Sequence, residues 1–122
     1  MSKAQWIKEN LKDGEQYAGL ILGKNGDADH HLILLPGEAE SVTWPQANEF
    51  AKKAGGELPT RREQSLLFAN LKEQFKPSWY WSGEQFAPDN CYAWATYFDY
   101  GYQDYCPKTG SFRARSVRRL PI

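Results

Sequence analysis

The residues best suited to chemistry in this sequence are aromatic rings and carboxylates that occur together in one stretch. Residues 79–106 hold eleven of the chain's eighteen aromatic residues and four carboxylates, but no lysine or arginine. That is more rings than one small core can hold. Because Trp and Tyr offer large, stiff and partly polar contact surfaces, they are enriched where proteins recognise ligands. The stretch therefore predicts a ligand-binding surface.

The candidate ligand-binding residues are the rings and carboxylates of this stretch that we expect to face outward. They are Trp79, Glu84, Phe86, Tyr97, Asp99, Tyr100, Tyr102, Asp104 and Tyr105. Rings flanked by carboxylates suit a sugar face or a basic protein patch, so the expected partner is a protein or a glycan. An alternative stays open, in which the tyrosines only cover the outside of a small sheet, where cross-strand aromatic pairs are stabilising.

The spacing of reactive residues predicts no enzyme, metal site or cofactor. The sequence has no Ser-His-Asp order, phosphate-binding loop or zinc-ligand spacing. His30 and His31 are adjacent, and neighbouring side chains on a strand point to opposite faces, so they cannot easily bind one metal. Asp27, Asp29 and His30 could surround a cation, but a solvated turn is the simpler interpretation.

The two cysteines, Cys91 and Cys106, leave two states open. They could form a disulfide, whereas a chain made in the cytosol would usually keep both as thiols. Neither has a histidine close in sequence, and Lys108 is the nearest basic residue. A reactive thiolate is therefore not expected.

Charge and length indicate one domain without a nucleic-acid or membrane partner. The chain has 122 residues, 41% of them hydrophobic, and a formal net charge of zero, which fits a single domain over residues 1–122. Four arginines cluster near the end of the sequence, and we expect them to pair with the carboxylates of residues 79–106. They are Arg113, Arg115, Arg118 and Arg119. The first ten residues lack the apolar core of a signal peptide, so the expected location is the cytoplasm, or a virion.

The elements that must position the aromatic stretch begin with a helix over residues 3–11 and a hairpin. The hairpin joins residues 17–22 to residues 31–35, and Asn25-Gly26 suits a turn with positive φ at both positions. Two capped helices follow. One begins after Thr43 and covers residues 44–54, and the other begins after Thr60 and covers residues 61–74.

The remainder of the chain predicts antiparallel strands. In order, we expect a short strand at 80–82, a loop at 84–90, a strand at 92–99, a turn at 100–101, a returning strand at 102–105, a turn at 107–110 and a final strand at 111–119. Alternation along the strand at 92–99 favours Trp94 and Phe98 for the core face.

Four motifs in this order resemble a known family. They are Leu58-Pro59-Thr60-x-x-Glu63, Tyr80-Trp81-Ser82, Ala93-Trp94-x-x-x-Phe98-x-x-Gly101 and Ala114-Arg115-x-Val117-Arg118. Over residues 42–119 the chain is similar to C-type-lectin-like domains. It more closely resembles the bacterial and phage domain of unknown function at the C-terminus of the Legionella collagen-like adhesin.

The resemblance implies an α+β, C-type-lectin-like fold. Two helices would pack on a twisted antiparallel sheet, preceded here by the N-terminal helix and β-hairpin. Trp94 and Phe98 would be core positions, Tyr80-Trp81 an aromatic anchor and Arg118 a paired strand residue. The lectins' calcium-binding triplets do not occur in this sequence, so calcium-dependent sugar binding is not expected.

Three functions compete at this point. The first is a non-enzymatic ligand-binding module of phage or prophage origin, which the resemblance favours. The second is a small phage-encoded inhibitor of a host cytoplasmic protein, which the short chain and neutral charge also suit. The third is an enzyme similar to formylglycine-generating enzymes, which use two cysteines. The chain is far shorter than those enzymes, and its cysteines lack an activating neighbour.

Overall fold

Three α-helices, one short 3₁₀ helix and eight strands make up residues 2–122, the part of the chain that the computed structural model describes. The first elements are α1 (Lys3–Asn10), β1 (Gln16–Ile21), β2 (His30–Leu34) and β3 (Ala39–Val42). The middle elements are α2 (Trp44–Lys53), α3 (Arg61–Leu71) and the 3₁₀ helix η1 (Lys72–Gln74). The last elements are β4 (Trp79–Gln85), β5 (Tyr92–Tyr97), β6 (Tyr102–Pro107), β7 (Phe112–Ala114) and β8 (Val117–Pro121).

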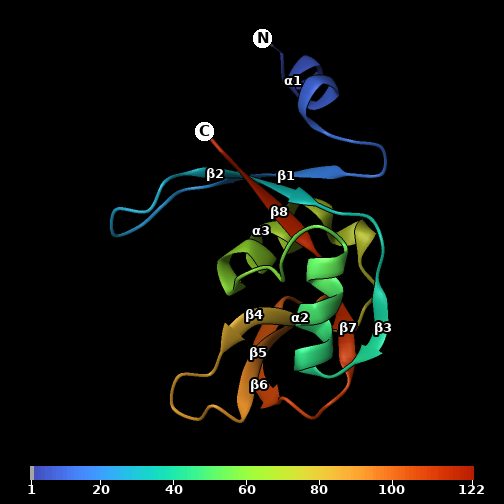
Figure 1. Ribbon diagram of the computed structural model, residues 1–122, viewed down its shortest axis with the longest axis vertical. Helices are drawn as coiled ribbons and strands as arrows, with labels where there is room; N and C mark the ends of the chain where they lie inside the picture. Colours follow the sequence, from blue (N-terminus) through green and yellow to red (C-terminus); the bar gives the residue numbers. More distant parts are fainter. Residues whose placement is uncertain (1) are drawn as a thin grey trace.

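The strands form two sheets. A three-stranded sheet has the order β1-β2-β8, and a five-stranded sheet has the order β3-β7-β4-β5-β6. All pairs are antiparallel except β4 with β7, which run parallel. In Figure 1 the three-stranded sheet lies beneath α1, and the five-stranded sheet occupies the opposite end of the molecule. The predicted α+β class and the predicted hairpin of β1 and β2 are confirmed.

Local hydrogen bonds explain where the two central helices begin, and both predicted starts are confirmed. The Thr60 amide donates to Glu63 Oε1 at 2.8 Å, and the Glu63 amide donates back to Thr60 Oγ1 at 3.2 Å. The Thr43 amide donates to Gln46 Oε1 at 2.9 Å. These bonds satisfy amides that have no partner inside a helix. The predicted helix over residues 61–74 is α3 followed by η1.

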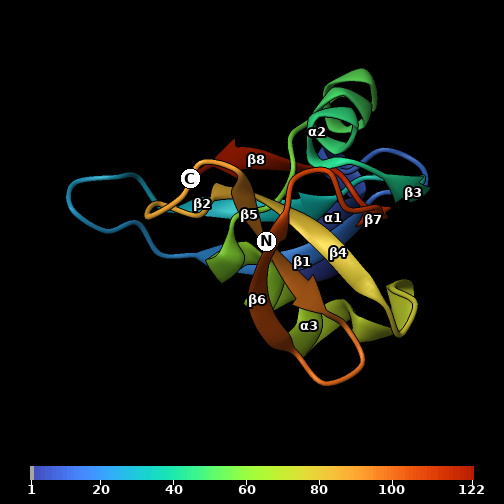
Figure 2. The same ribbon diagram turned by 90° about the horizontal axis from the view of Figure 1, so that it is seen from below.

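Helices α2 and α3 lie on opposite faces of β4 and β5, as Figure 2 shows. Each helix covers its own core. The core under α3 consists of Ala18, Ile21, Leu32, Leu34, Leu67, Leu71, Tyr80, Phe98 and Val117. The core under α2 consists of Ala47, Ala51, Leu58, Trp81, Ala93, Ala95 and Ala114. The central strands are therefore a middle layer, buried on both sides.

This double burial corrects the prediction for the core face of β5. Phe98 is buried in the α3 core as predicted, but Trp94 belongs to neither core. Ala93 and Ala95, which alternation places on the face opposite Phe98, are fully buried against α2. Small side chains on that face leave room for the helix to pack closely. Alternation alone cannot select one core face in a strand that has two.

Two strand boundaries also differ from the prediction. Strand β4 extends to Gln85, so Glu84 lies on a strand and not in a loop. The predicted final strand over residues 111–119 is wrong, because β7 and β8 belong to different sheets. Between them, Ser116 Oγ donates to Ala51 O at 3.0 Å, and Arg115 donates to Leu35 O at 3.0 Å. These bonds hold the chain where it crosses from one sheet to the other.

The arginine cluster pairs internally, as predicted, but with carboxylates outside residues 79–106. The pairs are Arg113 with Glu38 at 2.7 Å, Arg118 with Glu15 at 2.8 Å, and Arg119 with Glu63 at 2.8 Å and with Glu57. Arg115 instead donates to backbone carbonyls. The crossing between sheets places these arginines beside the N-terminal half of the chain. The arginines therefore do not neutralise the carboxylates of residues 79–106.

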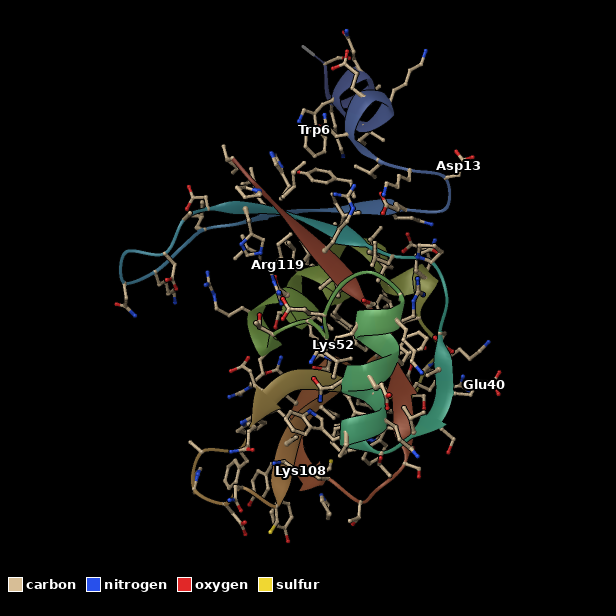
Figure 3. The ribbon with its side chains drawn as sticks, viewed as in Figure 1. Trp6, Asp13, Glu40, Lys52, Lys108 and Arg119 are labelled. Carbon is tan, nitrogen blue, oxygen red and sulfur yellow. The ribbon has the colours of Figure 1, made fainter. Side chains whose placement is uncertain are left out.

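Helix α1 lies outside the sheets, and none of its residues is buried. Trp6 holds it in place, with its ring centroid 4.3 Å from that of His31 and 5.0 Å from that of Tyr17. Figure 3 shows Trp6 directed from α1 toward the three-stranded sheet. None of the helices within residues 2–122 has the length and apolar character needed to cross a bilayer.

Replacing Leu67 by Ala should lower the free energy of unfolding by about 2–5 kcal/mol, because Leu67 is the residue of α3 that is fully buried in the core under this helix. Leu22 is 65% exposed, so Leu22→Ala is a matched control that should change it by less than about 0.5 kcal/mol. Urea denaturation measures both. Equal losses in the two variants would contradict the position of the α3 core.

Candidate functional site

The candidate residues from the sequence lie mainly on the hairpin of β5 and β6. The two strands pair from Tyr92 with Pro107 to Tyr97 with Tyr102, so the predicted returning strand is confirmed. Gly101 closes the turn at a φ of +84°, and its amide donates to Tyr97 O at 2.7 Å. A Cβ atom at this position would stand 3.1 Å from the Phe68 ring. The turn therefore packs closely on α3.

One side of the hairpin carries what we call the tyrosine face, formed by Trp79, Tyr97, Tyr100 and Tyr102. The rings follow one another, with centroids 5.3 Å apart for Trp79 and Tyr97, 6.2 Å for Tyr97 and Tyr100, and 5.8 Å for Tyr100 and Tyr102. Tyr100 is 68% exposed and Tyr102 is 64% exposed. Asp104 is on the same side of β6 as Tyr102, because alternate residues of a strand share a face. This is a wet aromatic surface with a carboxylate beside it.

The other side carries the Trp94 cluster, formed by Phe86, Tyr92, Trp94 and Tyr105. Phe86 stacks on Tyr105 with centroids 4.0 Å apart, and Trp94 lies 5.5 Å from Phe86 and 5.7 Å from Tyr105. The guanidinium carbon of Arg61 stands 3.5 Å from the Trp94 ring centroid. A side chain from the first turn of α3 thus covers Trp94, whereas Tyr105 of the same cluster is 46% exposed.

The predicted residues therefore do not form one surface. Tyr102 and Tyr105 are separated by an odd number of positions on one strand, which puts them on opposite faces. Glu84 is engaged elsewhere, since its Oε2 accepts from the Arg61 amide at 2.6 Å and so caps α3. Asp99 is half-buried in the turn. Tyr100 and Tyr102 of the tyrosine face are the most exposed rings of the predicted set, and Tyr105 on the other face is 46% exposed.

Strand β6 is the outer strand of the five-stranded sheet, and two positions of its backbone offer no free amide donor to another strand. The Tyr105 amide donates to Asp104 Oδ1 at 2.8 Å, and Pro107 has no amide hydrogen. Capped or missing donors are a known defence of sheet edges. Both positions therefore disfavour the addition of another strand at this edge.

A cavity of about 590 Å³, which no pattern in the sequence predicted, lies between the β1–β2 connection and the start of α3. Its walls include His30, Arg61, Glu63, Gln103 and Arg119, which come from four separated parts of the chain. Figure 3 shows Arg119 extending from β8 toward α3. No local sequence pattern predicts this cavity, because its residues are brought together only by packing between distant parts of the chain.

A buried carboxylate closes the inner wall of this cavity. Glu63 is fully buried; its Oε2 lies 2.8 Å from Arg119 Nε and 2.7 Å from His30 Nε2. Its Oε1 accepts from Arg119 Nη2 at 2.8 Å and from the Thr60 amide. Burial acts to raise the pKa of Glu63, but the hydrogen bonds from Arg119 and Thr60 and the arginine charge outweigh it and hold the pKa below its ordinary value. Glu63 is therefore a structural residue that ties α3 to His30 of β2 and Arg119 of β8.

The cysteines are both free thiols. Cys106 pairs with Ala93 across the hairpin, so Cys91 is its diagonal neighbour. Diagonal Cα atoms are about 7–8 Å apart, which is beyond the usual span of a disulfide. Burial and the nearby Asp104 raise the pKa of the Cys106 thiol, which is the opposite of what an activated nucleophile needs.

The two histidines face apart, as predicted. His30 contacts Glu63, whereas His31 Nδ1 lies 2.7 Å from the Tyr17 hydroxyl. Asp29 accepts from the Gly23 amide at 2.7 Å, which is a turn contact. Within residues 2–122, no group of His, Cys, Asp and Glu side chains is arranged to hold a metal ion.

No protein-family model matches the chain, and the search of curated proteins finds no match either. The function of this chain is therefore inferred from the arrangement of its own residues.

Replacing Glu63 by Gln should lower the free energy of unfolding by about 3 kcal/mol or more, because it leaves Arg119 without its buried counter-charge. Glu57 pairs with the same arginine but is 68% exposed, so Glu57→Gln should cost less than about 1 kcal/mol. Denaturant unfolding at neutral pH compares the two variants. A larger loss for Glu57→Gln would contradict the anchoring role of Glu63.

Acid should also destabilise the protein through Glu63. Because its pKa is lower in the folded than in the unfolded state, its contribution is full above the ordinary value of 4.5 and is lost as the pH falls through the folded-state pKa. The free energy of unfolding, followed from about pH 7 down to about pH 3, should decline less steeply in Glu63→Gln than in the wild type. Parallel curves would argue against a lowered pKa at this residue.

Proposed function

We propose that the chain is a non-enzymatic ligand-binding module that recognises a protein or a glycan through its tyrosine face. The observation that carries this proposal is the exposure of Tyr100 and Tyr102, at 68% and 64%, which are the most exposed rings of the hairpin. Tyr105, on the opposite face, is 46% exposed and stacks on Phe86. Exposed large rings at neighbouring positions are typical of surfaces that bind partners.

The rigidity of the hairpin supports this role. Tyr97 stacks on Trp79, and Trp79 in turn packs at the edge of the α2 core. The turn at Gly101 rests against Phe68. Rings that are already ordered lose little conformational entropy when a ligand binds, so more of the contact energy appears as affinity.

The charge around the tyrosine face favours certain ligands. Asp104 is exposed and Asp99 half-exposed, and the arginine cluster pairs with other carboxylates. Aromatic rings next to free carboxylates can stack on a sugar ring and accept its hydroxyl hydrogens, or can bind a basic segment of a protein. An acidic ligand is disfavoured at this face.

As part of the same proposal, we assign the α+β chain to a single C-type-lectin-like domain of phage or prophage origin. It would be similar to the C-terminal domain of the Legionella collagen-like adhesin. Tyr80 and Trp81 are buried, in agreement with an aromatic anchor, and Arg118 pairs with Glu15. Phe98 is a core residue. Trp94 departs from the pattern, because it packs under Arg61 and not in a core.

Replacing Tyr100 and Tyr102 together by Ser should weaken ligand binding by about tenfold or more, because two exposed contact rings are lost. Tyr105→Ser removes the same type of side chain from the opposite face of the hairpin and should leave binding nearly unchanged. Binding to an array of bacterial surface glycans and capture of proteins from bacterial envelopes and cytosol would measure both classes of partner.

Circular dichroism provides the control for folding in these variants. If the double variant folds and still binds every partner of the wild type, the tyrosine face is not the binding surface. That result is the one expected if the tyrosines only cover the sheet, whereas a loss of binding in a folded variant supports recognition by these rings.

A further inference from the structure

The cavity beside α3 lies on the other side of the β5–β6 hairpin from the tyrosine face. It is bounded by the β1–β2 connection, the first turn of α3, and single residues of β4, β6 and β8. At about 590 Å³ it falls within the size range of sites for small molecules. Neither the fold nor the proposed recognition surface requires an open space at this position.

Arg61 is held at this cavity in a fixed orientation. One face of its guanidinium group lies 3.5 Å from the Trp94 ring centroid, and its Nε donates to Gln103 Oε1 at 3.0 Å. Gln103 is fixed in turn, because its Nε2 donates to Arg61 O at 3.0 Å and to Ser65 Oγ at 3.3 Å. Ordering an arginine side chain usually costs much conformational entropy. The Arg61 side chain is already ordered before a ligand binds, so binding does not have to order it.

The terminal nitrogens of Arg61 remain available. Within residues 2–122, the guanidinium group makes one hydrogen bond, through Nε, and no ion pair. An arginine presents its two terminal nitrogens as a fork that matches the oxygens of a carboxylate or a phosphate. A stacked arginine with an unused fork at the wall of a cavity is arranged as an oxyanion receptor.

The charges lining the cavity favour the same kind of ligand. Glu63 is already neutralised by Arg119, whereas Lys24, Arg61 and Arg62 form no ion pair within residues 2–122. Glu84 and Asp27 also line the cavity, and their charges act in the other direction. One oxygen of Glu84 accepts from the Arg61 amide, so the N-terminus of α3 is already capped and the binding capacity lies in the side chains.

We infer that this cavity binds a small molecule through a carboxylate or phosphate group, with Arg61 as the fork that holds the oxyanion and Trp94 and Gln103 as the residues that position Arg61. Lys24 and Arg62 add positive charge at the rim. Glu84 and Asp27 limit the affinity, because their charges oppose an anion in the same cavity.

The test uses the full chain and titrates it with sodium phosphate, sodium glucuronate and sodium chloride at matched ionic strength. Nuclear magnetic resonance follows the Trp94 indole and Arg61 guanidinium N–H signals. Saturable shifts with phosphate, with glucuronate or with both support the inference and identify the preferred oxyanion. No saturable shift, or the same shift with chloride, would overturn it, since chloride cannot use the geometry of the fork.

Variants then assign the site. Arg61→Gln should weaken oxyanion binding by about tenfold or more, and Arg61→Lys, which keeps the charge but loses the fork, by about threefold or more. Glu84→Gln should strengthen it by about threefold. Lys8→Gln removes an exposed charge on α1 that does not line the cavity, and it should have no effect.

These variants also protect the test against misfolding. If Arg61→Gln does not fold, the opposite effects expected of Arg61→Lys and Glu84→Gln still decide the question in folded proteins. Equal weakening by Arg61→Gln and Lys8→Gln would mean that general charge binds the anion, and the inference would fail. Because the tyrosine face lies on the other side of the hairpin, failure here leaves the proposed function standing.

Discussion

The buried pairing of Glu63 with Arg119 is the interaction on which much of this structure depends. Glu63 belongs to the capping box that begins α3, and Arg119 belongs to the last strand of the three-stranded sheet. Their bidentate contact joins the helix to that sheet, and His30 adds a link to the strand beside it. A fully buried carboxylate is stable only when hydrogen-bond donors and a positive charge such as these satisfy it. The pair thereby holds α3 against the three-stranded sheet and forms the inner wall of the cavity.

The middle layer formed by β4 and β5 imposes the second constraint. With α2 on one face and α3 on the other, these strands have no free side, and contacts with solvent are left to the outer strand β6 and its turn. Exposed rings are consequently confined to that margin of the sheet. The two faces of the β5–β6 hairpin then differ, since one exposes Tyr100 and Tyr102 broadly, whereas on the other Arg61 from α3 stacks on Trp94 and Tyr105 is less exposed.

This arrangement would allow one rigid hairpin to support two kinds of recognition, as we propose. The tyrosine face suits neutral or basic partners because its flanking carboxylates lack arginine partners. The cavity on the reverse side suits an anion because Arg61 is oriented there with its terminal nitrogens unused. Both depend on the same packing of the hairpin against α3, in which Gly101 approaches the Phe68 ring.

The sequence by itself determined the features that depend on neighbouring residues: the helix starts at Thr43 and Thr60, the hairpin turn at Asn25-Gly26 and the concentration of rings in residues 79–106. Capping and turn geometry involve only a few consecutive residues, so their patterns are readable without the fold. Tertiary structure alone decided the rest. It split the candidate residues between two faces, covered β5 on both sides, divided the last strand between two sheets and assembled the Arg61 cavity. Those outcomes depend on contacts between residues far apart in the chain, whose energies no local pattern encodes.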